Sequence, residues 1–469
     1  MPDRRPLSVD LRTWLQGELA AWQQQALISG DQATSILAQY ETEQTARQKS
    51  QNVFLIALGG LAALLMAAAV LLLVSFNWQE IPAAGKLTII FGGLLATYGA
   101  GAIGWRIGYP RVAEVIFFFA ALLYGAAIWL IAQIFHMSAH YPDGYFWWAL
   151  GVLPLALILD TLPLHALFAV LLAAWFSTEI VGYRHLGAIL FGWRMHGVPN
   201  IVFLAPVLAA PGIWLAYRSQ SFLKLAIYLS LIVGWICLQP VAWRWDDAST
   251  YFIAAVGAML LILGESHLPG SKLAIPYRVL GALLYGGALL PLSSHWYYRF
   301  WNETPHVTLM TLVIAVSTGL VLAAAEFVRF RLLETGKKRQ ADAVADMRQR
   351  QWLPLVLAGV IAILTLLPAL SDASGGNDDA LWQILAVLIA NAAMLALAVW
   401  LMWVGLRDDR GQPFIGGIAY FLIWMLARYG DLFGIEGGML GAAALFAACG
   451  IAIGGFAWFW HRRKQVLHV

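Results

Sequence analysis

Long apolar runs separated by short polar turns dominate the chain from residue 53 to residue 460. A helix of about 20 apolar residues crosses roughly 30 Å of hydrocarbon, so runs of this length predict membrane spans. The boundary between the fourth and fifth runs depends on the turn DTLP, Asp160 to Pro163, so a count of twelve or thirteen stays open. The pattern predicts about fourteen spans, at 53–76, 86–106, 112–135, 145–161, 163–182, 199–217, 222–240, 250–266, 276–294, 307–328, 352–370, 381–405, 413–432 and 439–460.

Composition agrees with this pattern, since 61% of the 469 residues are hydrophobic and 12% are charged. Soluble domains usually have about 45–50% apolar and about 25% charged residues. The fold class predicted is therefore all-α, a polytopic transmembrane helix bundle. The net charge of +3 gives no reason to expect a nucleic-acid partner, and the lipid bilayer is the partner that the composition implies.

The distribution of basic residues predicts the orientation of the spans. Lys and Arg accumulate in short cytoplasmic loops. If the N-terminus lies in the cytoplasm, most of the basic loops also fall on the cytoplasmic side. The chain is then a multi-pass membrane protein with both termini in the cytoplasm. The basic loops on the inner side contain Arg106 and Arg111, Arg218 and Lys224, Lys272 and Arg278, Arg407 and Arg410, and the C-terminal HRRKQ, whereas Arg184, Arg194, Arg244 and Arg299 are exceptions.

Residues 1–50 predict a small cytoplasmic helical hairpin. In VDLRTWLQGELAAWQQQ an apolar stripe runs along one helix face, and Ser29 with Gln32 forms a capping box for a second helix. The turn is expected at Leu27 to Gly30. A module of this size is too small to bury a core, so it docks on the membrane domain, on the bilayer or on a protein partner.

The remaining chain divides into 51–328 with the first ten spans, 329–351 as a basic cytoplasmic loop, and 352–469 with the last four spans and a basic tail. The loop has seven basic and three acidic residues and is expected to rest on anionic lipid. ALLYGAA at 121–127 returns as ALLYGGA at 282–288, an offset of 161 residues that suggests two related halves. Glycines at four-residue spacing, as in FGGLLATYGAGAIGW, predict close helix contacts.

Two stretches of the sequence resemble a known family. WLQGELAAWQQQALISGDQATSILAQYE, followed by a span and by YGAAIWLIAQIFHMSAHYPDGYFWWALGVLPLALIL, is similar to the bacterial predicted membrane proteins grouped as domain of unknown function 2157. The resemblance covers roughly the first 185 residues. It implies an inner-membrane protein of Gram-negative type and brings no assigned activity, cofactor or catalytic residue.

Chemistry must be sought in the polar residues of the spans, because no standard enzyme motif or cofactor-binding motif occurs. Cys237 and Cys449 both fall in apolar runs without the spacing of a metal site. His136, His140 and Asp143 would suit a metal only if the helix continued past Phe135, whereas the PDG turn predicts that it ends near His136. We therefore expect no metal site, and interpret Gln133 and His136 as a rim that faces water.

The second candidate is Arg428 with Asp431, three residues apart on one face of the thirteenth span. An unpaired arginine in hydrocarbon is expensive, so Asp431 is the expected partner. The pair either lines a cavity or holds helices together, and the second interpretation is favoured. Asn391 lies near the centre of the twelfth span and can bond to a neighbouring helix. Other carboxylates lie near span ends, namely Glu114, Asp160, Glu179 and Glu265.

Three functions remain open from the sequence. The leading hypothesis is a transporter-like protein for a small solute, based on the span count, the duplication and the polar groups Arg428, Asp431 and Asn391. The alternative is a non-transporting scaffold or regulator that binds a partner through the N-terminal hairpin. An enzyme is the least favoured, and would depend on a periplasmic cluster of His136, His140, Asp143 and Glu179.

Overall fold

In the computed structural model, the regular elements of the described residues are helices joined mostly by short turns. The chain divides into two compact units, residues 1–139 and 140–469. The structure describes residues 9–40, 58, 61, 65, 80–137, 142–181, 203–242, 249–267, 271–294, 297, 317, 352–367, 379–407, 411–433, 447 and 450. The basic loop 329–351 and most of the predicted spans 53–76, 307–328 and 439–460 lie outside these residues.

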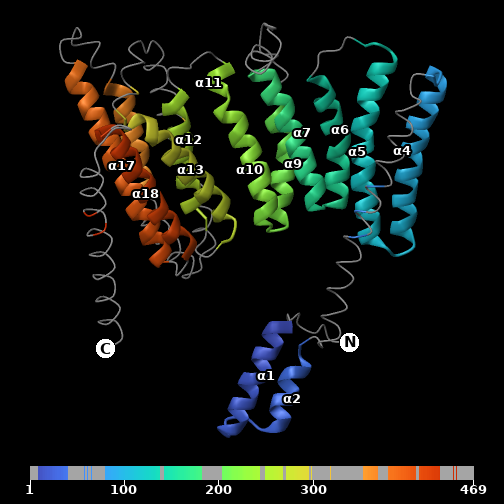
Figure 1. Ribbon diagram of the computed structural model, residues 1–469, viewed down its shortest axis with the longest axis horizontal. Helices are drawn as coiled ribbons and strands as arrows, with labels where there is room; N and C mark the ends of the chain where they lie inside the picture. Colours follow the sequence, from blue (N-terminus) through green and yellow to red (C-terminus); the bar gives the residue numbers. More distant parts are fainter. Residues whose placement is uncertain are drawn as a thin grey trace, which may run out of the picture. The chain divides into compact units, whose positions relative to one another are not determined.

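The first unit begins with α1 (Val9–Gln24) and α2 (Gly30–Ala38), which contact each other (Figure 1). The predicted capping box is present: the Ser29 hydroxyl accepts from the Gln32 amide N–H at 3.2 Å, and the Gln32 side chain accepts from the Ser29 amide N–H at 2.9 Å. The turn starts at Gln25, earlier than predicted, with Ala26 in the left-handed region at φ 55°. The cytoplasmic location of this pair stays a prediction.

The same unit contains α4 (Ala83–Arg106) and α5 (Pro110–Ile134), which pack against each other. Gly108, at φ 91°, turns the chain between them, and Pro110 begins α5 where its missing N–H costs nothing. A Cβ on Gly101 would lie 3.0 Å from the Phe117 ring, so this glycine makes the predicted close contact. Others in the same stretch, such as Gly92, make no comparable contact with the described residues.

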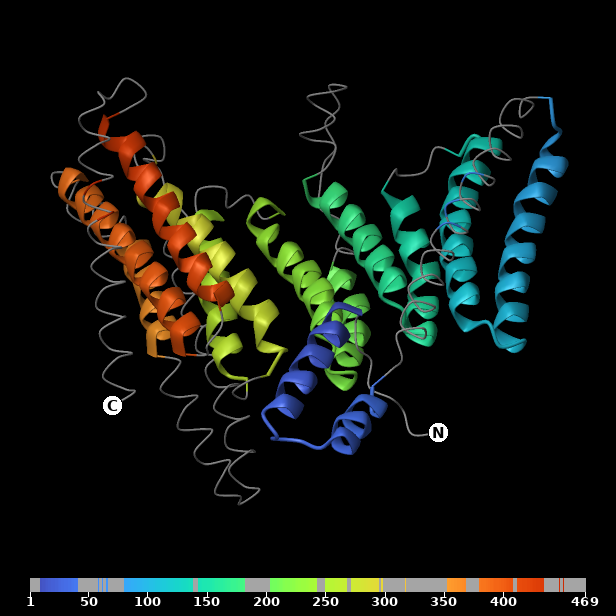
Figure 2. The same cartoon turned by 60° about the horizontal axis from the view of Figure 1, so that its bottom comes forward.

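The second unit is a row of antiparallel helices, seen from two directions in Figures 1 and 2. Neighbours in sequence pack together, and α7 with α10 and α13 with α17 join the pairs. The helices are α6 (Asp143–Leu159), α7 (Leu162–Ile180), α9 (Leu204–Arg218), α10 (Phe222–Cys237), α11 (Gln239–Ala242), α12 (Ser249–Glu265), α13 (Ala274–Leu292), a helix at Trp352–Leu367, α17 (Asp379–Arg407) and α18 (Gly411–Phe433).

Glycines allow the closest helix contacts of this unit. A Cβ on Gly257 of α12 would lie 2.5 Å from the Tyr285 backbone nitrogen of α13, and one on Gly417 of α18 would lie 2.7 Å from the Ala398 carbonyl oxygen of α17. Small residues let helix backbones approach where lipid gives no hydrophobic drive for association. Larger side chains such as Leu261, Leu289 and Leu397 fill the core around these contacts.

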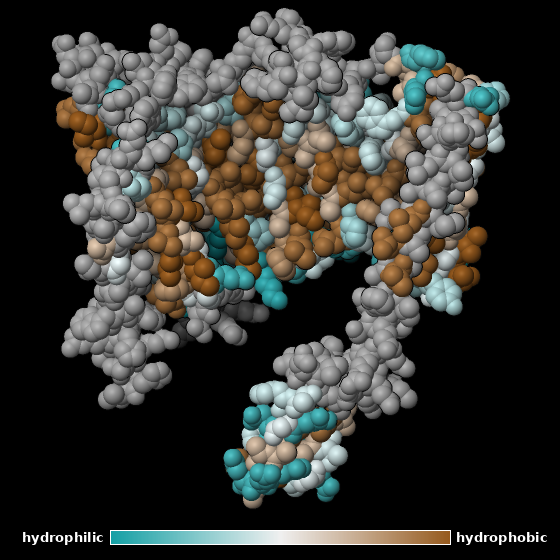
Figure 3. Space-filling view, viewed as in Figure 1, coloured by the Kyte–Doolittle hydropathy of each residue, from teal (hydrophilic) through white to brown (hydrophobic). Residues whose placement is uncertain are grey.

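Six helices in the described part are long and apolar enough to cross a membrane: α4, α5, α7, the stretch Phe222–Ala242, α13, and α17 from Leu381. Three shorter apolar helices, α6, α12 and Trp352–Leu367, accompany them. Figure 3 shows apolar side chains over much of the visible side of the second unit's helices. The helices start and end close to the predicted spans, and α6 and α7 separate at the predicted Asp160 turn. The total of about fourteen spans stays a prediction.

Candidate functional site

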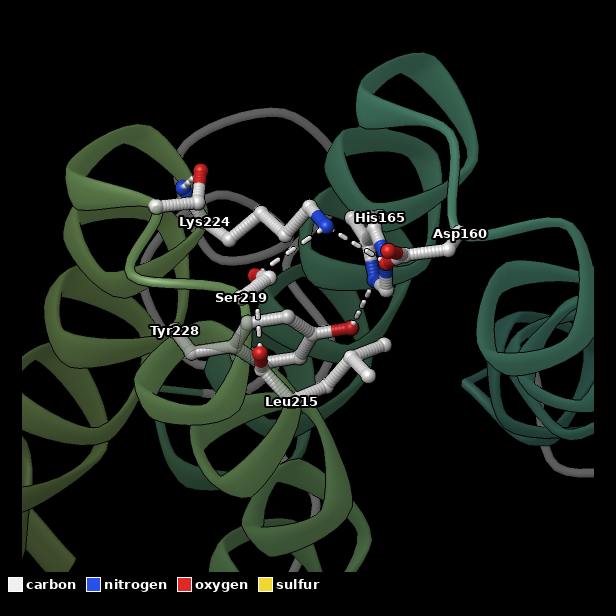
Figure 4. A network of polar contacts seen from close by, with 7 residues as sticks. Asp160, His165, Leu215, Ser219, Lys224 and Tyr228 are labelled. Carbon is white, nitrogen blue, oxygen red and sulfur yellow. Dashed lines mark hydrogen bonds and ion pairs between the residues drawn. The ribbon is translucent and has the colours of Figure 1, made fainter.

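A chain of polar side chains, most of them buried, joins the α6–α7 turn to α10 (Figure 4). Asp160 follows α6 in the left-handed region at φ 53°, a conformation that aspartate tolerates better than most residues. This backbone turn carries the carboxylate towards His165, in the first turns of α7, and towards Lys224, in the first turn of α10. Ser221 caps α10 by accepting from the Lys224 amide N–H.

The contacts in this chain are short and continuous. Lys224 Nζ donates to Asp160 Oδ1 at 2.6 Å, and the same oxygen lies 3.0 Å from His165 Nε2. His165 Nδ1 lies 2.7 Å from the Tyr228 hydroxyl. The His165 and Tyr228 side chains are fully buried, whereas the Asp160 side chain is 39% exposed. This series of polar contacts therefore leads from water at the helix ends into the helix bundle.

His165 can hold its two contacts in either protonation state. A neutral ring that donates from Nε2 to the carboxylate accepts at Nδ1 from the Tyr228 hydroxyl. A protonated ring donates at both nitrogens, and the hydroxyl then accepts, because a phenol can do both. Proton uptake at His165 therefore requires a hydroxyl rotation and no rearrangement of helices.

Lys224 and His165 act together on Asp160. Burial by itself raises the pKa of the Asp160 carboxyl, but the hydrogen bonds and charges of Lys224 and His165 outweigh burial and hold that pKa below its ordinary value. The carboxylate is thus charged at neutral pH. Lys224, only 8% exposed, is compensated by this contact.

Tyr228 is fixed by the glycine that faces it. A Cβ on Gly212 of α9 would lie 2.0 Å from the Tyr228 ring, so the ring occupies the space that a side chain would need. His165 also meets this ring edge-on, with centroids 5.5 Å apart. The hydroxyl is consequently held towards the imidazole.

The predicted intramembrane groups Arg428, Asp431 and Asn391 meet at a second cluster, at the end of α13. Arg428 Nη2 lies 2.8 Å from Asp431 Oδ2, and the guanidinium also donates to the Ser293 carbonyl and to the Ser293 hydroxyl. Asp431 Oδ1 accepts from the Ser294 hydroxyl at 3.1 Å. The predicted pair is present, and Arg428 satisfies the carbonyl of Ser293, the residue that follows the end of α13.

Asn391 connects three helices in this cluster. Its amide nitrogen donates to Val387 in its own helix and to the Ser293 carbonyl at 3.1 Å, and its oxygen accepts from the Trp424 indole at 2.8 Å. Each of these side chains bonds to another member of the cluster, whereas the buried Arg428 Nε has no hydrogen-bond partner among the described residues. The structural interpretation of Arg428 and Asp431 stays a prediction.

The other predicted site residues are dispersed. α5 ends at Ile134, and His136 follows it at φ 48° with an exposed side chain. Gln133, in the last turn of α5, is exposed as well. Asp143 begins α6, and Glu179 is buried near the end of α7. His140 lies outside the described residues. Within the ranges given above, no group of three His, Cys, Asp or Glu side chains could hold a metal ion.

A third group lies where α12 turns into α13. Arg278 Nε lies 2.7 Å from Glu265 Oε1, and its Nη2 donates to Glu265 Oε2 at 3.0 Å. Beside this ion pair, the Tyr217 hydroxyl lies 2.8 Å from the Tyr277 hydroxyl and 3.2 Å from His267 Nε2. Burial lowers the pKa of His267, which lies beyond the end of α12, and hydrogen bonding to its backbone neighbours only partly offsets that effect.

The sequence interpretation overlooked three members of the polar network around Asp160. Lys224 counted only as a topology signal, and His165 and Tyr228 lie in apolar runs. A single histidine in LPLHALFAVLL was a usable signal, because polar groups inside spans are costly. No spacing rule predicts that Lys224 meets Asp160, 64 residues away.

These helices and their buried polar groups define a helical membrane protein with several candidate spans, consistent with a multi-pass arrangement. Residues 20–165 match the family described as predicted membrane protein (DUF2157), which confirms the resemblance. The matched region runs from α1 to the start of α7 and includes Asp160 and His165. No curated protein and no solved structure matches the chain.

Proposed function

We propose that this protein is a transporter-like membrane protein that moves a small solute and couples its movement to a proton on His165. The observation that supports this most directly is the polar network Lys224–Asp160–His165–Tyr228, in which His165 and Tyr228 are fully buried. Ionisable groups inside spans are costly and often mark ion or proton paths. An imidazole between a water-accessible carboxylate and a buried phenol can take a proton from one side and release it.

The network of Lys224, Asp160, His165 and Tyr228 differs in one respect from the two ion pairs elsewhere in the bundle. Glu265 with Arg278, and Arg428 with Asp431, pair opposite charges on or between neighbouring helices, which suffices to explain them as structural. Asp160 and Lys224 already form such a pair without His165. If position 165 were needed only for packing, an apolar residue would suffice there. The titratable ring of His165 therefore favours a role in proton movement.

The test is solute uptake by proteoliposomes that contain the full chain. A defined mixture of organic anions, amines, sugars and inorganic ions is supplied outside under a proton gradient, and the lumenal content is measured by mass spectrometry. We expect at least one solute to accumulate above protein-free liposomes. His165→Gln keeps a polar side chain but cannot carry a proton. It should reduce accumulation at least about ten-fold, a smaller effect than the roughly 100-fold or more that positioned acid–base groups contribute to catalysis.

Matched variants separate proton movement from folding. Tyr228→Phe keeps the ring against Gly212 and removes only the hydroxyl, so uptake should fall while detergent-solubilised protein stays monodisperse. His136→Gln changes an exposed histidine and should leave uptake unchanged. If the unmodified protein accumulates no solute, or if His165→Gln transports normally, the proposal fails.

The scaffold function stays as a second candidate because Trp14, on α1, is 60% exposed. Large exposed aromatic side chains on a small helical module favour a docking role. If no solute moves and deletion of residues 1–48 releases a co-purifying protein, this function replaces the first.

A further inference from the structure

The second unit contains an apolar cavity of about 710 Å³ between α13, α17 and α18. Its walls include Val279 and Leu283 of α13, Trp400 of α17, and Ile423 of α18. Volumes of about 300–1,000 Å³ are typical of small-molecule sites. None of the polar chain Asp160, His165, Lys224 and Tyr228 lines it, so this cavity is separate from the site of the proposed function.

The charged groups of the cavity lie at one end, whereas the Tyr420 hydroxyl, farther along α18, donates to the Gly286 carbonyl. Lys272 lies just before α13, and Gln412 lies in the first turn of α18; both side chains are exposed, and both line the cavity. Among the described residues, no ion pair involves the Lys272 ammonium group. Arg278 also lines this end and is held by Glu265. The cavity thus has a cationic mouth and apolar walls.

The length of the cavity matches one leaflet of a bilayer. On α18 its lining runs from Gln412 to Ile423, which is about 16 Å at 1.5 Å per residue. This is about half of the roughly 30 Å hydrocarbon core. An acyl chain inserted along α18 would stay in one leaflet with its headgroup beside Lys272, on the side predicted to be cytoplasmic. Basic pockets between spans on that side suit anionic headgroups.

We propose that this cavity is a binding site for an anionic phospholipid, with acyl chain against Leu283 and Ile423 and headgroup phosphate against Lys272. The occupant is a lipid rather than a soluble anion, because most of the lining is apolar and Lys272 supplies charge only at the mouth. The proposal does not depend on transport.

The test is native mass spectrometry of the purified full chain with phosphatidylglycerol, and with phosphatidylcholine that has the same acyl chains. We expect phosphatidylglycerol to remain bound preferentially. Lys272→Ala should weaken its binding about five-fold, as expected for one basic residue near a headgroup, and Lys272→Arg should keep it. Inorganic phosphate at millimolar concentration should not displace the lipid.

Glycine variants test the apolar part of the site. Gly416 lines the cavity, and a Cβ there meets no described atom within 4 Å, so the side chain of Gly416→Leu starts in open space and takes up cavity volume. It should reduce binding of both lipids. Gly287→Leu is the matched control, since Gly287 of α13 is equally open but does not line the cavity. Equal binding of the two lipids, unaffected by Lys272→Ala and Gly416→Leu, would show ordinary annular lipid and overturn the proposal, as would displacement by phosphate.

Discussion

Asn391 shows how a single amide connects helices inside an apolar bundle. It donates to Val387 and Ser293 and accepts from Trp424, so its side chain joins α17 to the end of α13 and to α18. Removing one partner of such a bond leaves the other in an environment with few replacements. The measured gain is still modest in membranes, because unfolded helices in lipid also find partners.

We therefore predict coupling between Asn391 and Trp424. Asn391→Ala and Trp424→Phe should each destabilise the protein, and a double-mutant cycle should give a coupling energy of about 0.5–2 kcal/mol. Unfolding by titration with sodium dodecyl sulfate measures it. Asn391→Ala combined with Trp403→Phe should be additive, because Trp403 lies on the same helix but makes no hydrogen bond with Asn391. A zero coupling for the first pair would show that its hydrogen bond contributes nothing to stability.

At the scale of elements, glycine positions determine how closely the helices pack. α12 and α13 approach so closely that a Cβ on Gly257 would lie 2.5 Å from the Tyr285 backbone nitrogen, and a Cβ on Gly281 would lie 2.9 Å from Leu261 in the same interface. Backbone atoms cannot rotate away as a flexible side chain does. The interface thus tolerates no added methyl group unless the helices separate.

We expect Gly257→Ala to lower the free energy of unfolding by about 1–3 kcal/mol, the usual cost of overpacking. Gly287→Ala, on the open face of α13, should change it by less than about 1 kcal/mol and in the stabilising direction, because alanine favours helix. Thermal unfolding in detergent compares the two. Equal stability of both variants would mean that α12 and α13 are not closely packed.

At the scale of the whole molecule, the orientation in the membrane stays a prediction from the basic loops. The turns that contain Asp160, Gln220 and Lys272 all join helices that pack as antiparallel neighbours, so within the second unit they belong to one end of the bundle. That end is predicted to be cytoplasmic. The end of α5 near His136 is predicted to face the periplasm.

Single cysteines test this orientation, in a chain where Cys237 and Cys449 are replaced by serine. A membrane-impermeant thiol reagent should label His136→Cys in cells with a permeable outer membrane, because this exposed residue would face the periplasm. Gln220→Cys is also exposed and should be labelled only after the inner membrane is opened. The reverse pattern would invert the assigned topology.

The helices of this protein are determined largely by its sequence. Apolar runs of sufficient length, the DTLP turn and the Ser29 capping box are local features, and they fix the helix ends through hydrogen bonding and desolvation of the nearby backbone. The polar partnerships are different. Asp160 meets Lys224 across 64 residues and Arg428 meets Ser293 across 135, and only helix packing brings these groups within hydrogen-bonding distance.

The Arg428–Asp431 pair was predictable because both residues lie on one helix face, three positions apart, where no tertiary information is needed. The buried chain through His165 and the cavity beside Lys272 were not, since each is built from several helices whose neighbours a single sequence does not specify. Sequence determined which segments enter the hydrocarbon, through the cost of burying backbone and charge. Tertiary packing alone decided which polar groups compensate one another there, and where space for a ligand remains.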